Sequence, residues 1–466
     1  MVNSSPNSEV EPTRPAQFSG QGINRSVEVK GKKGWRRWLA FAGPAYLISV
    51  GYMDPGNWAT DLSGGYHYGY ALLWVIGLSS LMAVFLQALC ARLGIATGRD
   101  LAQACRDYCP KPAAHALWLL AEIAIIACDV AEVIGSAVAL KLLFGLDLRL
   151  GVLLTGFDVL LLLALMRFGF RKIEAIVLAL VATVFVSFAI NLVWAHPNLA
   201  AAAHGLVTPS LPDTQALVIA VGILGATVMP HNLYLHSSIV QTRANEETSE
   251  GRRDAIRWAT WDTVIALGAA FFVNAAILIL AASVFYGGKE VVEQLEDAYK
   301  LLTPQLGSAA AVLFAVALLA SGQSSTLTGT LAGQVVMEGF TDLRVKPWVR
   351  RLVTRLLAII PAMLIVIAYG EKTNAPLVLS QVVLSMQLPF AVIPLIWFTS
   401  DQKRMGEFVS PMWARVVGVL VAATILVADV YVLVTQYDWR LVVIGSITLL
   451  AYFAWAFFGR AKPTAT

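Results

Sequence analysis

The residues best suited to chemistry lie in an apolar stretch, residues 49–59, which is interrupted by a carboxylate, a proline and a glycine. An aspartate at membrane depth costs about 2.5–3.5 kcal/mol, so Asp54 requires a compensating partner. Pro55 lacks an N–H and Gly56 is permissive, which predicts that the helix opens here and exposes carbonyl groups. Together with the Asp54 carboxylate and the Asn57 amide, these carbonyls would form a set of hard oxygen ligands suited to a cation.

A second apolar stretch, residues 226–232, repeats the pattern x-Pro-x-Asn at Pro230 and Asn232. Corresponding breaks in the two halves of a membrane protein indicate a transporter's substrate site near the midplane. The alternative is that each proline only kinks a packed helix, but two matched breaks, one carrying a carboxylate, favour a binding site. Met229 adds a soft thioether, which favours manganese, iron or cadmium over alkaline-earth ions unless the side chain only fills space.

The composition places both stretches in a membrane. Of the 466 residues, 58% are hydrophobic and only 14% are charged, which predicts an all-α polytopic membrane protein. Residues 1–37 are instead polar and end in a basic cluster, without the apolar region of a cleaved signal peptide. This composition predicts a disordered cytoplasmic tail.

The apolar segments predict twelve membrane helices. They begin near Trp38, Tyr70, Ala114, Leu150, Ile173, Gln215, Ala259, Gly307, Trp348, Pro376, Met412 and Leu441. Of the 34 lysines and arginines, those in the expected outside loops are Lys141, Arg149, Lys289, Lys300, Lys372 and Arg440. The positive-inside rule therefore supports twelve helices with both termini in the cytoplasm. The net charge of +4 then reflects orientation and gives no reason to expect a nucleic-acid partner.

The spacing of the two breaks predicts an inverted repeat. Five helices separate the start of the first broken helix from the start of the second, so the two run in opposite directions across the membrane. We therefore expect a first five-helix repeat over residues 38–195, an inverted second repeat over 214–399, and two appended helices over 411–459. The corresponding fold class is a LeuT-like bundle of five plus five helices with two additional C-terminal helices.

An acidic stripe marks the third expected helix. Glu122, Asp129 and Glu132 are spaced by seven and three residues, so they share one helical face that lipid would not tolerate. Arg350 and Arg351, at the start of the ninth helix, are the natural partners. We interpret the stripe as a proton pathway, and the alternative is a buried salt-bridge network that only fixes helix packing.

Two histidines and a glutamine are further polar residues inside expected helices. His231 and His236 lie five residues apart, roughly 140° around a regular helix, so they are not expected to chelate one ion together. His231 at the break could relay a proton, whereas an interhelical hydrogen bond is the simpler role for His236. Gln381 could add an amide oxygen to a central cation. Cys105 and Cys109 fall in a cytoplasmic loop, where free thiols are expected rather than a disulfide.

The two broken motifs carry a resemblance to a known family. The sequences Asp-Pro-Gly-Asn at 54–57 and Met-Pro-His-Asn at 229–232, followed by Leu-Tyr-Leu-His-Ser, resemble the signature motifs of the Nramp divalent metal transporters. The resemblance, closest to the bacterial branch, implies proton-linked import of manganese or ferrous iron, with cadmium also carried, across the cytoplasmic membrane. The metal is then substrate, no cofactor is expected, and we expect a functional monomer in the lipid bilayer.

The resemblance also implies roles for particular residues. The metal site would comprise the side chains of Asp54, Asn57 and Met229 and the carbonyls of Ala226 and Gly51, and Gln381 would join on occlusion; Gly51 stands where relatives commonly have alanine. The proton-linked network would comprise Asp54, His231, His236, Glu122, Asp129, Glu132, Arg350 and Arg351.

Two other functions remain open from the residues alone. A cation-coupled amino-acid symporter shares the fold, but it would be expected to present a glycine-rich unwound segment rather than a fixed aspartate and a thioether. A membrane metalloenzyme would need a ligand run such as His-Glu-x-x-His, which the sequence lacks. We therefore expect a transporter and no enzyme.

Overall fold

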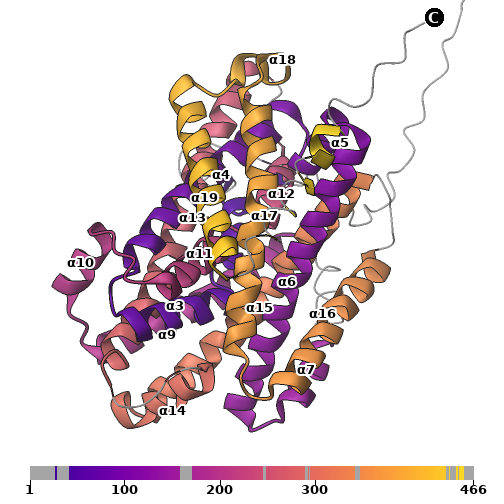
Figure 1. Ribbon diagram of the computed structural model, residues 1–466. Helices are drawn as coiled ribbons and strands as arrows, with labels where there is room; N and C mark the ends of the chain where they lie inside the picture. The colour runs from indigo at the N-terminus through magenta and orange to yellow at the C-terminus, as the bar shows by residue number, and fades with distance from the viewer. Residues whose placement is uncertain are drawn as a thin grey trace, which may run out of the picture.

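The protein is almost entirely helical in the computed structural model (Figure 1). The structure describes residues 27–28, 41–157, 170–244, 248–288, 292, 294–341 and 347–436, together with 440, 445, 448–449 and 451–455. Within these residues, nine helical segments are long and apolar enough to cross a membrane. Eight of them are built on α4 (Leu73–Thr97), α6 (Lys111–Phe144), α9 (Phe170–Ala195), α13 (Ser249–Val284), α15 (Ser308–Thr341), α16 (Pro347–Tyr369), α17 (Asn374–Ser400) and α19 (Met412–Gln436).

The ninth segment contains one of the two predicted breaks. It joins α11 (Thr214–Val228) to α12 (Pro230–Ile239), and the break falls at Met229, whose backbone has a φ of 42°. A positive φ is uncommon for a residue with a side chain, so the surrounding packing must hold this turn. Pro230 occupies the first position of α12, where its missing N–H costs no helical hydrogen bond.

The first expected helix is also broken where the sequence predicts it. It is divided into α2 (Pro44–Gly51) and α3 (Pro55–Tyr68), each too short to span a bilayer alone. Two other expected helices fall largely outside the described residues. The segment near Leu150 is described as α7 (Leu148–Thr155), and only single turns of the last expected helix are described. The number twelve therefore stays a prediction, whereas the all-helical membrane fold is confirmed.

Short elements close the two ends of the bundle. In Figure 1, α5 (Leu101–Tyr108) and α18 (Gln402–Met405) lie toward one end and α14 (Leu295–Leu306) lies at the other, whereas α10 (Leu199–Val207) lies at the left flank. The 3₁₀ turns η1 (Val240–Thr242) and η2 (Gly406–Phe408) follow α12 and α18.

Part of the expected tail is paired to the body of the protein. The strand β1 (Val27–Glu28) runs parallel to β2 (Arg243–Ala244), which directly follows η1. These two residues differ from the disordered segment expected over 1–37, because backbone hydrogen bonds fix them. The rest of that segment lies outside the described residues.

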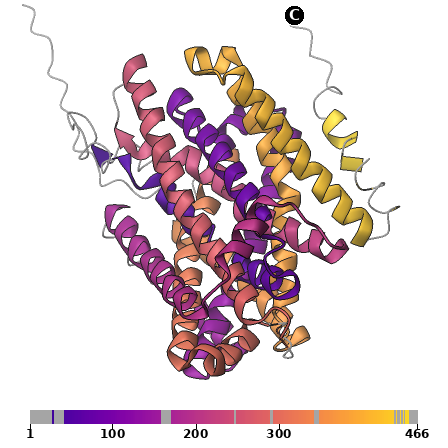
Figure 2. The same cartoon turned by 90° about the vertical axis from the view of Figure 1, so that its left-hand side faces the viewer.

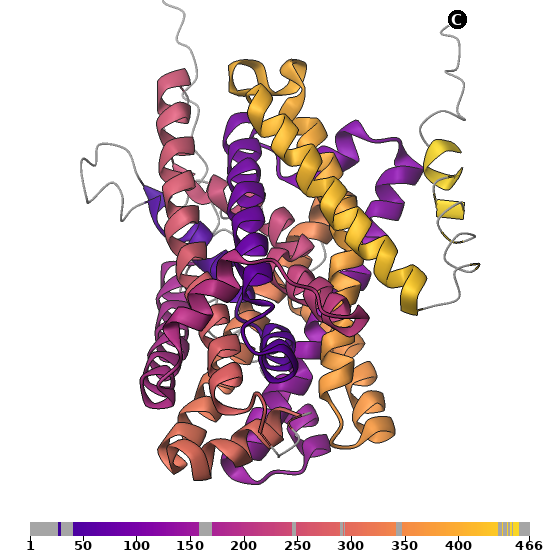
Figure 3. The ribbon, with the colours of Figure 1, turned by 60° about the vertical axis from the view of Figure 1, so that its left-hand side comes forward.

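The helices differ in how much lipid they face. Long, mostly buried helices such as α6, α15 and α17 pack together in the interior, whereas only 28% of the α19 span is buried. Figures 2 and 3 show α19 running obliquely along one edge of the bundle and α9 along the other. The broken helices lie inside this frame: α3 packs against α13, and α11 packs against α17. The frame thus encloses both breaks away from lipid.

Candidate functional site

Asp54 lies at the centre of the first break and is fully buried. It caps α3: its Oδ1 atom accepts a hydrogen bond from the backbone N–H of Asn57 at 2.8 Å. Its own N–H donates to the carbonyl of Gly51, the last residue of α2, at 3.3 Å. One carboxylate therefore stabilises the start of α3 while its second oxygen, Oδ2, stays available to other groups.

The carbonyls of the break are more occupied than the sequence suggests. The carbonyl of Tyr52 accepts from the Asn57 side-chain amide at 3.0 Å, and that of Met53 accepts from the Trp58 indole at 3.2 Å and from the Ser321 hydroxyl. The expectation of a row of free carbonyls is therefore wrong for these two. The hydrogen bond to Tyr52 fixes the orientation of the Asn57 side-chain amide. Its oxygen, Oδ1, has no partner among the described residues, although the side chain is only 1% exposed.

The second break adjoins the first. The Asn232 amide donates to the Met229 thioether at 3.4 Å, and both side chains are fully buried. A Cβ placed on Gly51 would contact the Asn232 amide nitrogen and lie 3.2 Å from the Met229 sulfur. The structure thus brings Gly51, Asp54 and Met229 together, with Ala226 buried one turn earlier at the end of α11.

Gln381 reaches the same region from α17. A Cβ on Gly56 would overlap the Gln381 side-chain amide, so the glycine makes room for it. Gln381 Nε2 donates to Ser380 at 3.0 Å, and its Oε1 is buried without a partner in the described part of the chain. Its oxygen and that of Asn57 are both unpaired acceptors, which is the arrangement that a dehydrated cation would satisfy.

The acidic stripe lies on α6 and faces α15. Asp129 and Glu132 are 7% and 1% exposed, and a Cβ on Gly329 would lie 3.1 and 3.3 Å from their carboxylate oxygens. Glu122 lies two turns away, half-buried, and accepts from the Trp118 indole at 2.9 Å. The stripe therefore faces the protein interior as expected, but only two of its three members lie beside each other.

The basic partners expected for this stripe cannot be placed. Arg350 and Arg351 belong to the first turns of α16, and their side chains lie outside the described residues. Among the described basic residues of α16, Arg355, one turn further on, lies within electrostatic reach of Glu132, and its guanidinium donates to the Thr155 carbonyl at 2.8 Å. Sequence reasoning missed Arg355 because the spacing along α16 does not reveal which of its basic residues turns inward.

The two histidines have separate surroundings. His236 Nδ1 lies 3.0 Å from Gln87 Oε1 on α4; Gln87 in turn donates to the Tyr52 hydroxyl at 2.8 Å. A hydrogen-bonded chain therefore links α12 to the first break, as expected for an interhelical contact. His231 Nε2 instead lies 3.9 Å from the sulfur of Cys128, a buried thiol on α6 that the sequence analysis did not assign.

The start of α2 is tied to three other segments. Arg243 forms a buried ion pair with Glu174 of α9 at 3.0 Å and donates to the Ala42 carbonyl at 2.7 Å. Asp262 of α13 accepts from the Ala45 backbone N–H at 3.0 Å. The Asp262 contact satisfies the N–H of Ala45 in the first turn of α2, and the Arg243 contact holds the residue two positions before the helix.

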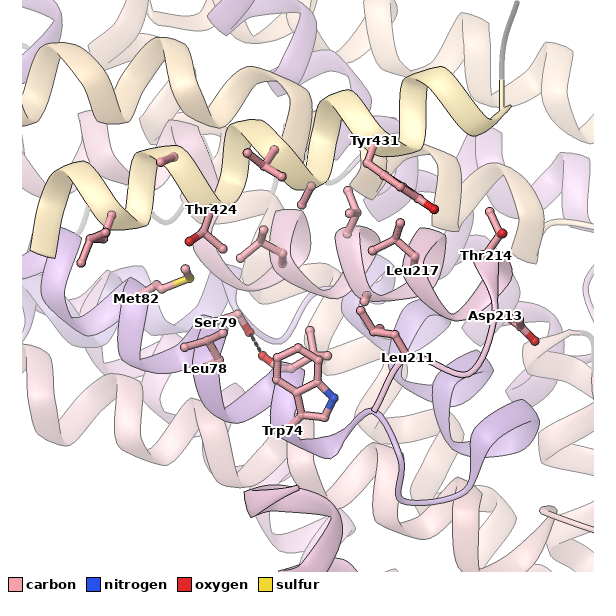
Figure 4. Close-up of a pocket in the computed structure, with 18 residues that line it drawn as sticks. Trp74, Leu78, Ser79, Met82, Leu211, Asp213, Thr214, Leu217, Thr424 and Tyr431 are labelled. Atoms are coloured by element: carbon pink, nitrogen blue, oxygen red, sulfur yellow. Dashed lines mark hydrogen bonds between the residues drawn. The ribbon is translucent and has the colours of Figure 1, made fainter. Parts of the chain in front are cut away.

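A large cavity near these helices is not the site. It encloses about 810 Å³ between α4, α11 and α19 and is lined mainly by apolar side chains, with Trp74 and Tyr431 at its walls (Figure 4). Among the described residues, no group of three or more His, Cys, Asp or Glu is arranged to hold a metal. Any metal at the breaks would therefore depend on mixed ligands: one carboxylate, amide oxygens, carbonyls and sulfur.

Comparison with known proteins identifies relatives of the chain. The family profile described as "Natural resistance-associated macrophage protein-like" matches residues 45–435. A divalent metal cation transporter MntH of Nostoc sp. is 55% identical over 426 residues, covering 90% of this chain and 96% of the relative. A protein of the same name from Xanthomonas campestris pv. campestris is 58% identical over 409 residues, covering 86% and 92%.

Solved structures agree with these relatives. A crystal structure of the Eremococcus coleocola manganese transporter superposes with a TM-score of 0.85 at 39% identity, covering 93% of this chain and 97% of that one. The nucleobase-cation-symport-1 transporter Mhp1 has a TM-score of 0.57 at 16% identity, covering 97% and 98%, which is a likeness of fold alone. The LeuT-like fold predicted from the sequence is thereby confirmed.

Proposed function

Because the chain belongs to the Nramp family of membrane metal transporters, we propose that it imports divalent transition metal ions, manganese and ferrous iron, across the cytoplasmic membrane, linked to protons. Cadmium is expected to be carried as well, because a thioether at the site suits soft ions. The protein is a transporter and not an enzyme. The amino-acid symporter considered from the sequence finds no support among the relatives.

The observation that carries the proposal is the meeting of the two helix breaks. Asp54 is the only acidic residue within the two interrupted stretches, residues 49–59 and 226–232, and Gly51 lies against Met229 across the breaks. The buried oxygens of Asn57 and Gln381 have no donor among the described residues, so a cation between the breaks would satisfy them. In this proposal Asp54 compensates the charge of the ion, and the oxygens of Asn57 and Gln381 replace water ligands. Met229 provides the preference for transition metals.

Protons are proposed to travel by a second route. Asp129 and Glu132 lie on α6 beside Gly329, and the His236–Gln87–Tyr52 chain links α12 to α4 and to the first break. Because acidic residues buried within a membrane usually have a functional role, we assign the acidic stripe to proton movement, with Arg355 as a nearby cation. Asp129→Asn should then impair proton flux more than metal binding, and equal losses of both would place the stripe in the metal site.

The same proposal includes the arrangement of the chain in the membrane. The two repeats would comprise residues 38–195 and 214–399, with 411–459 appended, and both termini would lie in the cytoplasm. Labelling single cysteines placed at each terminus with an impermeant reagent in intact cells tests this orientation. Labelling from outside would contradict it.

The central experiment is uptake into proteoliposomes. Wild-type protein should accumulate radioactive manganese, faster with an inward proton gradient, and should not accumulate labelled amino acids. Asp54→Asn keeps the shape but removes the charge that offsets dehydration of the ion, so uptake should be lost in a folded protein. Manganese uptake by Asp54→Asn at the wild-type rate would overturn the site, and amino-acid uptake by wild type would favour the symporter.

A further inference from the structure

A thiol lies against the proposed metal site. Cys128 of α6 is a free cysteine and is 2% exposed. Its sulfur lies 3.7 Å from Asp54 Oδ2, 3.9 Å from Glu132 Oε1 and 3.9 Å from His231 Nε2. Three separate elements therefore direct polar atoms at one sulfur, which is unusual for a cysteine that serves only to fill space.

The carboxylate of Asp54 connects this thiol to the unpaired amide. One carboxylate oxygen binds the backbone of Asn57, whose side-chain Oδ1 is buried without a partner among the described residues; the other faces the Cys128 sulfur. A cation bound by Asp54 and the Asn57 oxygen would thus have the thiol beside it. The unpaired oxygen is an observation independent of the cysteine, and it indicates a ligand at this place.

The two sulfurs of the region belong to one packed group. Cys128, Met229 and Leu384 form a small cluster of buried side chains, drawn from α6, the second break and α17. A thioether is a neutral soft donor, whereas a thiolate is an anionic and stronger one. An ion that can use both would gain more from this site than an ion that prefers oxygen.

We propose that Cys128 supplies a second sulfur to the transported ion and thereby sets the preference of the site toward thiophilic metals such as cadmium and zinc. The inference rests on the proposed function of the same site. As the metal–sulfur bond forms, the S–H bond breaks, and the proton passes to Glu132 Oε1 or His231 Nε2. Manganese, which favours oxygen, binds through Asp54, Asn57 and the carbonyls and depends little on the thiol.

The test separates sulfur chemistry from packing. Cys128→Ser keeps a hydrogen-bond donor of similar shape but removes the soft atom, and Cys90→Ser, a buried thiol on α4, is the matched control. Competition of cadmium and zinc against manganese uptake should weaken on the order of tenfold in Cys128→Ser, the scale at which metal-site substitutions act. Manganese uptake itself should persist, and Cys90→Ser should behave as wild type.

A second measurement does not depend on transport. In a variant with Cys90, Cys105 and Cys109 changed to serine, cadmium should produce a thiolate-to-metal charge-transfer band in the ultraviolet, because Cys128 is then the only thiol. The absence of this band overturns the proposal even if Cys128→Ser fails to fold. An unchanged order of competition in folded Cys128→Ser also overturns it. Should wild type carry no metal at all, the proposed function fails, while the band still tests the cysteine.

Discussion

The side-chain amide of Asn232 donates a hydrogen bond to the sulfur of Met229 at 3.4 Å, in a space that exists because residue 51 has no side chain. This contact orients one lone pair of the thioether toward Asn232, and the other remains for a metal. Three residues of two different helix breaks are therefore interdependent. The first prediction follows from this dependence.

Gly51→Ala should be tolerated but should weaken metal binding. The three atoms nearest to the added Cβ belong to the ends of the Asn232 and Met229 side chains and not to the backbone, so a shift of these side chains can make room for it. Loss of the amide–thioether contact should cost about 1 kcal/mol, or roughly a fivefold weaker affinity. Manganese titration of purified protein measures the change. In an Asn232→Ala background the same substitution should have no further effect on affinity, and a full additive loss would contradict the coupling.

Met229→Ala should change selectivity more than activity. The substitution removes the thioether but keeps the Asp54 charge and the Asn57 oxygen, so cadmium should lose most and manganese less. Water can enter the vacated space and supply an oxygen ligand, which should improve the standing of calcium and magnesium. Inhibition of manganese uptake by calcium, magnesium and cadmium measures this. An unchanged order of inhibition would mean that Met229 only fills space.

Gly225→Ala should destabilise the protein. A Cβ at this position would overlap the backbone carbonyl of Gln381 and lie 2.7 Å from the backbone nitrogen of Ser385, so α11 and α17 would have to separate. Overpacking of this kind costs about 1–3 kcal/mol. Gly268→Ala, on α13 with nothing within 4 Å, is the matched control and should be neutral or slightly stabilising. Thermal unfolding in detergent compares the two, and equal melting temperatures would refute the close approach.

Asp100 should make stability depend on pH. Burial raises the pKa of this carboxyl, at the start of α5 outside the membrane spans, from 3.8 to about 7. Between these values the folded protein holds a proton that the unfolded chain has lost, so its contribution to stability falls as the pH rises. Asp100→Asn keeps a capping oxygen and cannot ionise. Melting temperatures over this range should fall less for Asp100→Asn than for wild type; parallel curves would exclude the effect.

The fold and the positions of both breaks could be predicted from the sequence, because Pro55 and Pro230 leave a local signature within long apolar segments. Long hydrophobic helices can be predicted for the same reason, because the apolar character of a helix and the charges of its flanking loops are properties of single segments. The sequence also placed Asp129 and Glu132 in the interior, since lipid excludes both. The structure agrees on the breaks, on the long apolar helices and on the burial of the two acids.

Contacts between segments could not be predicted in the same way. The sequence gives no signal for Cys128, because a cysteine among apolar residues is usually a packing residue. Only the structure shows that Asp54 and His231 lie beside it. The break was expected to expose carbonyl groups, but the carbonyls of Tyr52 and Met53 accept hydrogen bonds from Asn57, Trp58 and Ser321. No periodicity of the sequence connects these positions. Arg355 is hidden for the same reason.

Four helix ends meet at the two breaks, and they affect how long an ion stays. The carboxyl ends of α2 and α11 present about half a negative charge each, and the amino ends of α3 and α12 present about half a positive charge each. Asp54 caps the positive end of α3, so part of its charge is already offset before an ion arrives. The attraction of the proposed metal site for an ion is therefore weaker than that of an unscreened carboxylate. We expect an ion bound there to leave sooner than it would leave a carboxylate whose charge is not offset by a helix end.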